Sequence, residues 1–177
     1  MTKLCLRILS GSLVTLLFCA TLYALDTDST EPLSISANSA DLNRKTGVGT
    51  YRGNVKVTQG STIVTGDVLI TYMNDQRKLN KAVVKGNTTT RAHYQTVPKP
   101  DESTLHARAN KITYFPQKRL VILEGDAEIL QNGNSFKAPY ITYNLNTQHI
   151  ISKNSPDKQQ RTTIMIRQTK QVLKQSL

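Results

Sequence analysis

Val55-Lys56-Val57-Thr58 alternates apolar and polar residues, directly behind the pair Gly53-Asn54. Period-two alternation puts the apolar side chains on one face of an extended chain, so it is typical of a half-buried β-strand. A Gly-Asn pair beside such a pattern indicates either a tight turn or a bulge that bends the strand. The same pattern returns at Ala127-Glu128-Ile129 behind Gly125-Asp126. Strands rather than helices therefore decide the fold.

Further β-rich runs continue in both directions from this stretch. Leu33-Ser34-Ile35-Ser36 alternates in the same way, and Leu120-Val121-Ile122-Leu123 is a fully apolar run that ends at turn residues. Outside the first 24 residues, no window keeps apolar residues at helical spacing for three turns. Short strands at close intervals predict an all-β protein, which would be a sandwich, a jelly roll or a solenoid-like stack.

An internal repeat accompanies the strands. A small residue, then Asn, Asp or Pro, then any residue, then an apolar one occurs four times, with starts 29 residues apart in each pair and the pairs offset by 72. We therefore expect a duplicated unit at about 33–72 and 105–143, joined by the more variable stretch 74–104. Such units bury their apolar faces by stacking on one another. The four motifs are Ala37-Asn38-Ser39-Ala40, Gly66-Asp67-Val68-Leu69, Ala109-Asn110-Lys111-Ile112 and Ala138-Pro139-Tyr140-Ile141.

The register of this repeat has one ambiguity. Ile70-Thr71-Tyr72 and Ile141-Thr142-Tyr143 are alike but align one residue off the offset of 72. A slip of one residue turns every side chain of a strand to the other face of the sheet. The sequence leaves open whether the two copies keep one register there.

The N-terminal residues 1–24 have the composition of a secretory signal peptide. Lys3 and Arg7 precede an uncharged run, 8–23, that is too short and too interrupted by polar residues for a membrane span of roughly 20 apolar residues. We expect cleavage after Ala24, a single β domain over 25–168 and a basic tail over 169–177. An uncleaved anchor helix is the alternative.

Charge and cysteine content narrow the choice of partner. Both cysteines, Cys5 and Cys19, lie inside the predicted signal peptide, so the exported chain would have no disulfide and no thiolate metal site. Removing Lys3 and Arg7 lowers the net charge of +11 by two, to +9. A basic exported protein favours anionic lipid or polysaccharide as its partner, and we expect no nucleic acid.

No residues have the pattern of a catalytic or cofactor site. The three histidines are scattered without metal-ligand spacing, and no glycine-rich phosphate loop is present. Glu124, Asp126 and Glu128 form the one acidic cluster that would suit a paired-carboxylate hydrolase. However, Asp126 follows a turn glycine and Glu128 falls on the polar face of an alternating strand. We therefore expect neither an enzyme nor a cofactor or metal.

Two segments near the middle and the end of the chain have their own signals. Pro98 and Pro100 remove backbone donors and fix φ, so 94–104 is predicted to be a loop. The segment 162–166 is the candidate for a last strand, and the residues beyond 169 are expected to fray.

Five blocks of this sequence resemble the OstA-like family of periplasmic lipopolysaccharide-transport proteins. The resemblance covers nearly all of the chain beyond the predicted signal peptide, although Pro139 stands where a polar residue is usual. The blocks are Glu31-Pro32-Leu33-Ser34-Ile35, Tyr51-Arg52-Gly53-Asn54-Val55-Lys56-Val57-Thr58-Gln59-Gly60, Gly66-Asp67-Val68-Leu69-Ile70, His106-Ala107-Arg108-Ala109-Asn110-Lys111-Ile112-Thr113-Tyr114 and Leu120-Val121-Ile122-Leu123-Glu124-Gly125-Asp126-Ala127.

The resemblance implies a twisted antiparallel β-jelly roll, open along one side, whose interior holds the acyl chains of lipid A. It also implies a carrier of lipopolysaccharide whose subunits stack head to tail. The stack would join the OstA-like domains of an inner-membrane extraction complex and an outer-membrane translocon. The strands around 33–35 and 162–166 would be the exposed edges that pair between subunits.

Eleven residues are expected to point inward and to line the core or the lipid groove. Plain core packing is the alternative for each of them. Leu33, Ile35, Ile112 and Tyr114 are the preferred cargo contacts, because matching positions lie near the groove of the family. The eleven residues are Leu33, Ile35, Val55, Val57, Leu69, Ile112, Tyr114, Leu123, Ile129, Ile141 and Tyr143.

Two other functions remain open at this point. One is a membrane-anchored OstA-like relative of the same pathway, which would keep its N-terminal helix. The other is an exported polysaccharide-binding β-sandwich, which would bind sugar that lacks acyl chains.

Overall fold

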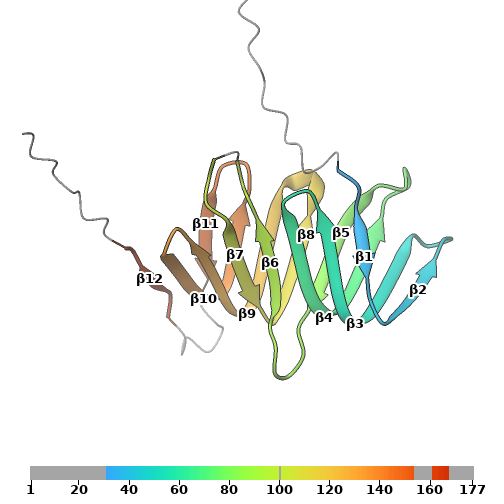
Figure 1. Cartoon of the computed structure of the whole chain (residues 1–177), viewed down its shortest axis with the longest axis horizontal. Coiled ribbons are helices and arrows are strands. Elements are labelled where there is room, and N and C mark those ends of the chain that lie inside the picture. Colours follow the sequence, from blue (N-terminus) through green and yellow to red (C-terminus); the bar gives the residue numbers. More distant parts are fainter. Residues whose placement is uncertain (1–30, 100, 154–160, 168–177) are drawn as a thin grey trace, which may run out of the picture.

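A single antiparallel sheet of 12 strands makes up the protein in a computed structural model that describes residues 31–99, 101–153 and 161–167. The strands follow one another along the long axis of the molecule, from β1 and β2 at one end to β12 at the other (Figure 1). The predicted signal peptide and basic tail lie outside the described residues. Within the described part of the chain, no helix is long and apolar enough to cross a membrane.

Four long strands form the frame of the sheet, and each one has two short strands side by side along one of its edges. The long strands are β3 (Val48–Gln59), β4 (Thr62–Met73), β9 (Leu120–Gln131) and β10 (Asn134–Asn144). The short strands are β1 (Ser34–Ser36) and β2 (Ser39–Asn43) on β3, β5 (Leu79–Lys85) and β6 (Ala92–Thr96) on β4, β7 (Leu105–Ala109) and β8 (Lys111–Phe115) on β9, and β11 (His149–Lys153) and β12 (Thr163–Met165) on β10.

The sheet bends along a line that runs through the repeated sequence motifs. In β3 the ladder to β4 shifts between Arg52 and Val55, where Gly53 and Asn54 both have positive φ, +77° and +50°. Two residues in this left-handed region make a bulge that turns the strand, and glycine and asparagine tolerate it best. The Gly-Asn pair inside β3 is thus a bulge rather than a hairpin turn.

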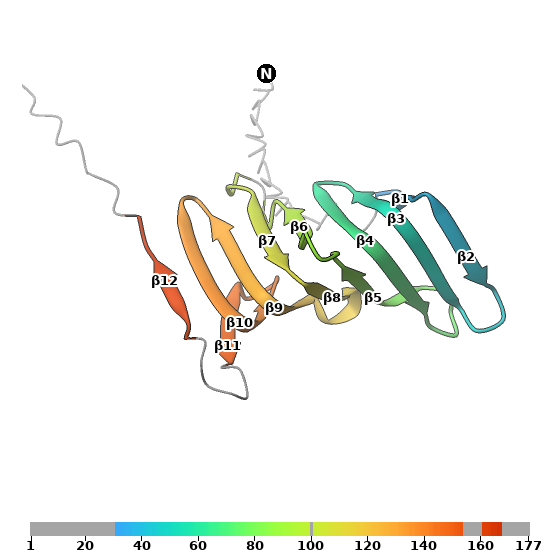
Figure 2. The ribbon, with the colours of Figure 1, turned by 90° about the horizontal axis from the view of Figure 1, so that it is seen from below.

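Neighbouring strands break at the same level. The Asn38 amide between β1 and β2 donates to the Gly53 carbonyl at 2.9 Å, and the Asn110 amide between β7 and β8 donates to Gly125 at 2.8 Å. In β10 the ladder shifts across Pro139, where no donor is needed. The motifs therefore fold the sheet into two layers, which Figure 2 shows from below.

The first layer contains β1, β6, β7 and β12 together with the halves of the long strands that pair with them. The second layer contains β2, β5, β8 and β11 with the other halves. The interior between the layers takes every second side chain of each strand. The predicted all-β, open-sided and duplicated jelly roll is confirmed.

The duplication keeps one register throughout. The bounds of β9 are those of β3 displaced by 72 residues, and Leu69 of β4 and Ile141 of β10, also 72 apart, are both buried. Because Ile70 is next to the buried Leu69, it faces outward, so its likeness to Ile141 does not reflect a slip.

The sequence indicated that the stretch 74–104 joins the two copies. In the structure this stretch is more than a simple connection. It contains β5 and β6, which pair with β8 and β7 and so join the two halves of the sheet. Tyr94 and Thr96, which lie in the segment predicted to be a loop, belong to β6. The predicted last strand is confirmed as β12, which pairs with β10.

Candidate functional site

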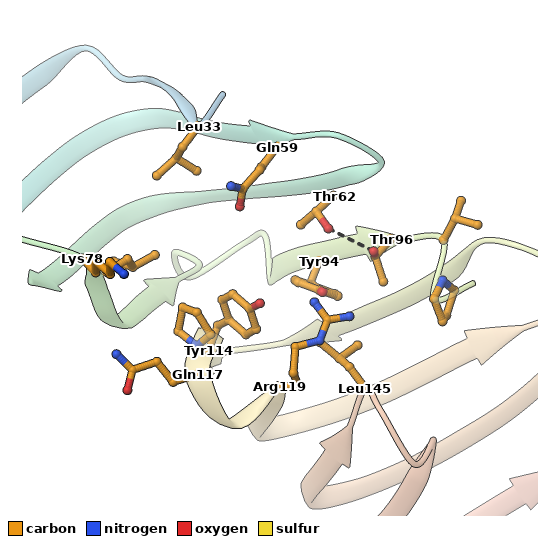
Figure 3. Close-up of a pocket in the computed structure, with 14 residues that line it drawn as sticks. Leu33, Gln59, Thr62, Lys78, Tyr94, Thr96, Tyr114, Gln117, Arg119 and Leu145 are labelled. Atoms are coloured by element: carbon orange, nitrogen blue, oxygen red, sulfur yellow. Dashed lines mark hydrogen bonds between the residues drawn. The ribbon is translucent and has the colours of Figure 1, made fainter. Parts of the chain in front are cut away.

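The two layers separate on the side away from the bend and leave a cavity of about 530 Å³ between them. This mouth is lined from the first layer by Thr62 and Thr96, and from the second-layer side by Lys78, Tyr114 and Arg119 (Figure 3). Its volume lies within the roughly 300–1,000 Å³ of small-molecule sites. The residues reach it because they stand at the ends of strands farthest from the bend.

An apolar recess of about 50 Å³ lies deeper between the layers. Its walls come from β1, β3 and β6 on one side and from β5 and β8 on the other, with β4 contributing to both. Alternation along each strand supplies every second side chain to it. The apolar lining comprises Leu33, Ile35, Val57, Val64, Leu69, Leu79, Ala82, Val84, Ile112 and the rings of Tyr94 and Tyr114.

The eleven inward residues expected from the sequence divide into two groups. Six line the recess, and these include all four of the preferred cargo contacts: Leu33, Ile35, Val57, Leu69, Ile112 and Tyr114. Five are no more than 4% exposed and belong to the core without lining either cavity: Val55, Leu123, Ile129, Ile141 and Tyr143. Contact between any of the eleven and a lipid stays a prediction.

A cluster of hydroxyl groups at the mouth was missed by the sequence reasoning. The Oγ1 atoms of Thr62 and Thr96 lie 2.9 Å apart, and the Tyr94 hydroxyl bonds to both side chains. Burial raises the pKa of Tyr94, so it stays a neutral hydroxyl. The period-two pattern of Ala92–Thr96 was a usable signal, but Pro98 and Pro100 close behind it favoured a loop.

The mouth and the recess together form the groove, and the N-terminal half of the molecule supplies most of its lining. In the C-terminal half, Nε2 of Gln148 donates to both carboxylate oxygens of Glu102, at 3.0 and 2.7 Å, across the side where a mouth would otherwise lie. Leu105 and Leu145 of this half are almost completely buried, and Leu145 also lines the mouth. Burial, with the Glu102 charge as a second cause, raises the pKa of Tyr143.

Glu124 and Glu128, two members of the acidic cluster noted in the sequence, form ion pairs with lysine and arginine side chains. Glu124 lies 2.6 Å from Lys111, and Glu128 lies 3.2 Å from both Arg91 and Lys137. Partial burial by itself would raise the pKa of Glu128, but its hydrogen bonds to Lys137 and Arg91 and their charges lower it overall. A carboxyl group held ionised in this way is unsuited to general-acid catalysis.

Two of the histidines come together although they are 13 residues apart. His93 Nε2 of β6 lies 3.3 Å from His106 Nδ1 of β7, and their rings are nearly parallel. They lie on the outer face of the first layer, away from the groove. Among the described residues, no group of three or more His, Cys, Asp or Glu could hold a metal ion.

This arrangement defines a class of protein. An antiparallel jelly roll, with an apolar recess below a polar and basic mouth, can hold an elongated apolar chain and leave a polar head group at the surface. Such an arrangement suits a binding module for an amphiphile.

Comparison with known proteins gives the family of the chain. Residues 34–149 match the family model described as LptA/(LptD N-terminal domain) LPS transport protein. The lipopolysaccharide export system protein LptH of Pseudomonas aeruginosa is 35% identical over 125 residues, which are 71% of this chain and 70% of LptH. The lipopolysaccharide export system protein LptA of Escherichia coli is 27% identical over 145 residues, 81% of this chain and 75% of LptA.

A solved structure agrees with these sequence matches. The crystal structure of LptH, described as the LptA-homologous periplasmic component of the lipopolysaccharide transport device of Pseudomonas aeruginosa, superposes with a TM-score of 0.73. The match has 30% identity and covers 80% of this chain and 99% of that one. The chain therefore belongs to the LptA/(LptD N-terminal domain) family of lipopolysaccharide transport proteins.

Proposed function

We propose that this protein is a periplasmic carrier of lipopolysaccharide that holds the acyl chains of lipid A in the apolar recess. The observation that carries the proposal is the recess itself, which is lined by aliphatic and aromatic side chains from both layers and opens through the mouth to solvent. Family membership and the names of the relatives support the choice of cargo. The protein would act by binding and release rather than by catalysis.

The small size of the recess suits a protein that binds its lipid reversibly rather than one that retains it. Each buried methylene contributes about 0.8 kcal/mol, so one chain of about twelve carbons offers ~9 kcal/mol in gross terms. The recess of about 50 Å³ must widen to accept such a chain. Separating packed side chains offsets part of the gain. The lipid would then bind tightly enough to leave a membrane but weakly enough to pass to the next protein.

The mouth provides for the phosphorylated head of the cargo. Lys78 and Arg119 both line it, and the Arg119 side chain is positioned by Asn146 Oδ1 at 3.2 Å. An arginine oriented in this way suits a phosphate group, and a lysine adds a point charge. The acyl chains would point inward and the phosphates would remain at the rim.

The partners follow from the two ends of the sheet. β1 and β2 form one edge and β11 and β12 form the other, and each edge leaves backbone groups that another strand can pair with. Export through the N-terminal signal peptide would place the protein in the periplasm. There it would stack head to tail and join the OstA-like domains of inner- and outer-membrane components.

Site-specific photo-crosslinking to lipopolysaccharide tests the groove. A photoreactive residue at Ile35 or Tyr114 should label the lipid, because both positions line the recess. Gln95 is the control, since it alternates with Tyr94 along β6 and faces outward. Tyr143, 3% exposed in the core, should also stay unlabelled. If neither Ile35 nor Tyr114 is labelled while the protein binds the lipid, the groove assignment is wrong.

Chemical deacylation of the cargo tests the function. The carrier should lose binding when the acyl chains are removed, whereas a polysaccharide-binding protein would bind both forms equally. Sequencing the N-terminus of the exported protein addresses the membrane-anchored alternative. An intact segment 1–25 would contradict the soluble carrier.

A further inference from the structure

The outer faces of the two layers differ in chemistry. One row of side chains crosses the outer face of the first layer from β3 to β10, and it is polar or charged throughout: Lys56, Thr65, His93, Arg108, Glu128 and Lys137. The central row on the outer face of the second layer crosses from β4 to β11, and it is β-branched throughout: Ile70, Val83, Thr113, Ile122, Thr142 and Ile151.

The β-branched row faces away from the interior, although neighbouring side chains leave Thr113, near its middle, only 7% exposed. Ile70 stands between Leu69 and Thr71 of β4, whose side chains line the recess, so it faces the opposite way. At the far end of the row Ile151 is 46% exposed. A sheet with one solvated face normally turns polar residues outward, as the row from Lys56 to Lys137 does on the first layer. The second layer instead has a β-branched row across the middle of its outer face, with charged side chains beside it, which favours contact with a partner there.

Lysines and aromatic rings border this row. Lys81 Nζ lies 4.0 Å from the centre of the Tyr72 ring on one side, and Lys153 Nζ lies 5.8 Å from the Tyr140 ring on the other. A third such pair, Lys118 with Phe115, flanks the same face at 5.7 Å. All three cation–aromatic pairs found in the described residues are therefore on the second layer.

The formal charge of this face is positive. From β2 to β11 its outward side chains include five cations and two carboxylates, and one carboxylate, Glu124, is already paired with Lys111. The cations are Arg52, Lys81, Lys85, Lys111 and Lys153, and the other carboxylate is Asp41. A partner with spread negative charge and an apolar layer beneath it complements this surface.

We propose that the outer face of the second layer docks on the surface of an anionic lipid bilayer. Short β-branched side chains on a broad sheet cannot fill a deep pocket, but they can rest among head groups. Tyrosine rings with lysines beside them suit the boundary between lipid and water. Each lysine near an anionic membrane surface strengthens binding by about fivefold. This inference concerns the opposite side of the second layer from the groove and does not depend on the cargo.

Vesicle binding with paired charge variants tests the proposal. The whole protein is mixed with vesicles of phosphatidylcholine, alone or with an equal amount of phosphatidylglycerol, and the bound fraction is measured by sedimentation. We expect binding to the anionic vesicles only, and weaker binding in high salt. Lys81→Gln with Lys153→Gln should lower the partition coefficient roughly 25-fold. The matched control is Lys56→Gln with Arg108→Gln, which removes two charges from the first layer.

A fluorescent probe shows which face meets the lipid. An environment-sensitive dye is attached to a single cysteine at Ile151 or, as the control, at Leu130 on the first layer, after Cys5 and Cys19 are replaced by serine. Both positions are similarly exposed, at 46% and 38%. On anionic vesicles only the dye at Ile151 should shift to the blue.

Three results would overturn the proposal. The first is an equal loss of binding, or none, in the two charge pairs, because net charge alone would then govern adsorption. The second is an equal shift of both dyes. The third is a shift of the Ile151 dye that grows with protein concentration in the absence of vesicles, because a second copy would then cover the face.

Discussion

At the scale of single residues, Gly125 makes the bend of β9 possible. Its φ is +75°, and a Cβ atom there would lie 2.7 Å from Asn110 Nδ2. We expect Gly125→Ala to lower the free energy of unfolding by about 1–2 kcal/mol through backbone strain alone, with the contact adding to it. Urea denaturation measures the loss. In a double-mutant cycle, Asn110→Ala should relieve the contact part of it, and strict additivity would show that the contact has no effect.

His93 makes stability depend on pH. Burial, the Arg108 charge and the neighbouring His106 lower its pKa below the ordinary 6.5. Between the lowered pKa of the folded chain and the ordinary 6.5, the unfolded chain binds a proton that the folded chain does not. The contribution of His93 to the free energy of unfolding is therefore complete above pH 6.5 and is lost as the pH drops toward the folded pKa.

We therefore expect the urea midpoint to fall between about pH 7.5 and about pH 5.5, and to fall less in His93→Gln. The interval stays above the range in which Glu128, whose pKa lies below 4.5, takes up a proton. Equal pH slopes in the two proteins would contradict the assignment to His93.

At the scale of elements, the sequence predicts the strands better than it predicts the groove. The long strand around Val55 could be predicted, because alternation has a direct backbone cause. Its bend was one of the two alternatives that the Gly-Asn pair left open. β6 was missed because its alternation is only five residues long and prolines follow closely. Val55 and Val57 look alike in sequence, since both are apolar and inward. Only the packing of other elements leaves Val57 beside a cavity and closes over Val55.

Those two valines allow a matched test on one strand. Val55 is 2% exposed in the core, whereas Val57 is half-buried and lines the recess. Val55→Ala should cost about 2 kcal/mol of stability and leave lipid binding unchanged. Val57→Ala should cost less stability but weaken binding of acylated cargo several-fold. Chemical denaturation and a lipid-binding titration measure the two effects, and loss of binding in Val55→Ala alone would reverse our placement of the groove.

At the scale of the whole molecule, the two halves have the same fold but differ in how their interiors are packed. The N-terminal half supplies most of the mouth and the recess, whereas the C-terminal half has the Glu102–Gln148 hydrogen bonds and the almost completely buried Leu105 and Leu145. The sheet has two different ends, so the proposed head-to-tail stack would join unlike edges. A heterologous junction of this kind continues into a chain unless it closes into a ring.

Head-to-tail stacking predicts an asymmetric result for edge variants. Leu42 of β2 is 60% exposed at one end of the sheet, and Ile164 of β12 is 58% exposed at the other. Leu42→Lys and Ile164→Lys should each abolish chain formation, because every junction uses both edges. A mixture of the two variants retains one intact pair of edges, so sedimentation velocity should show dimers of one molecule of each and nothing longer. If either variant dimerises by itself, the junction joins like edges and the head-to-tail arrangement is wrong.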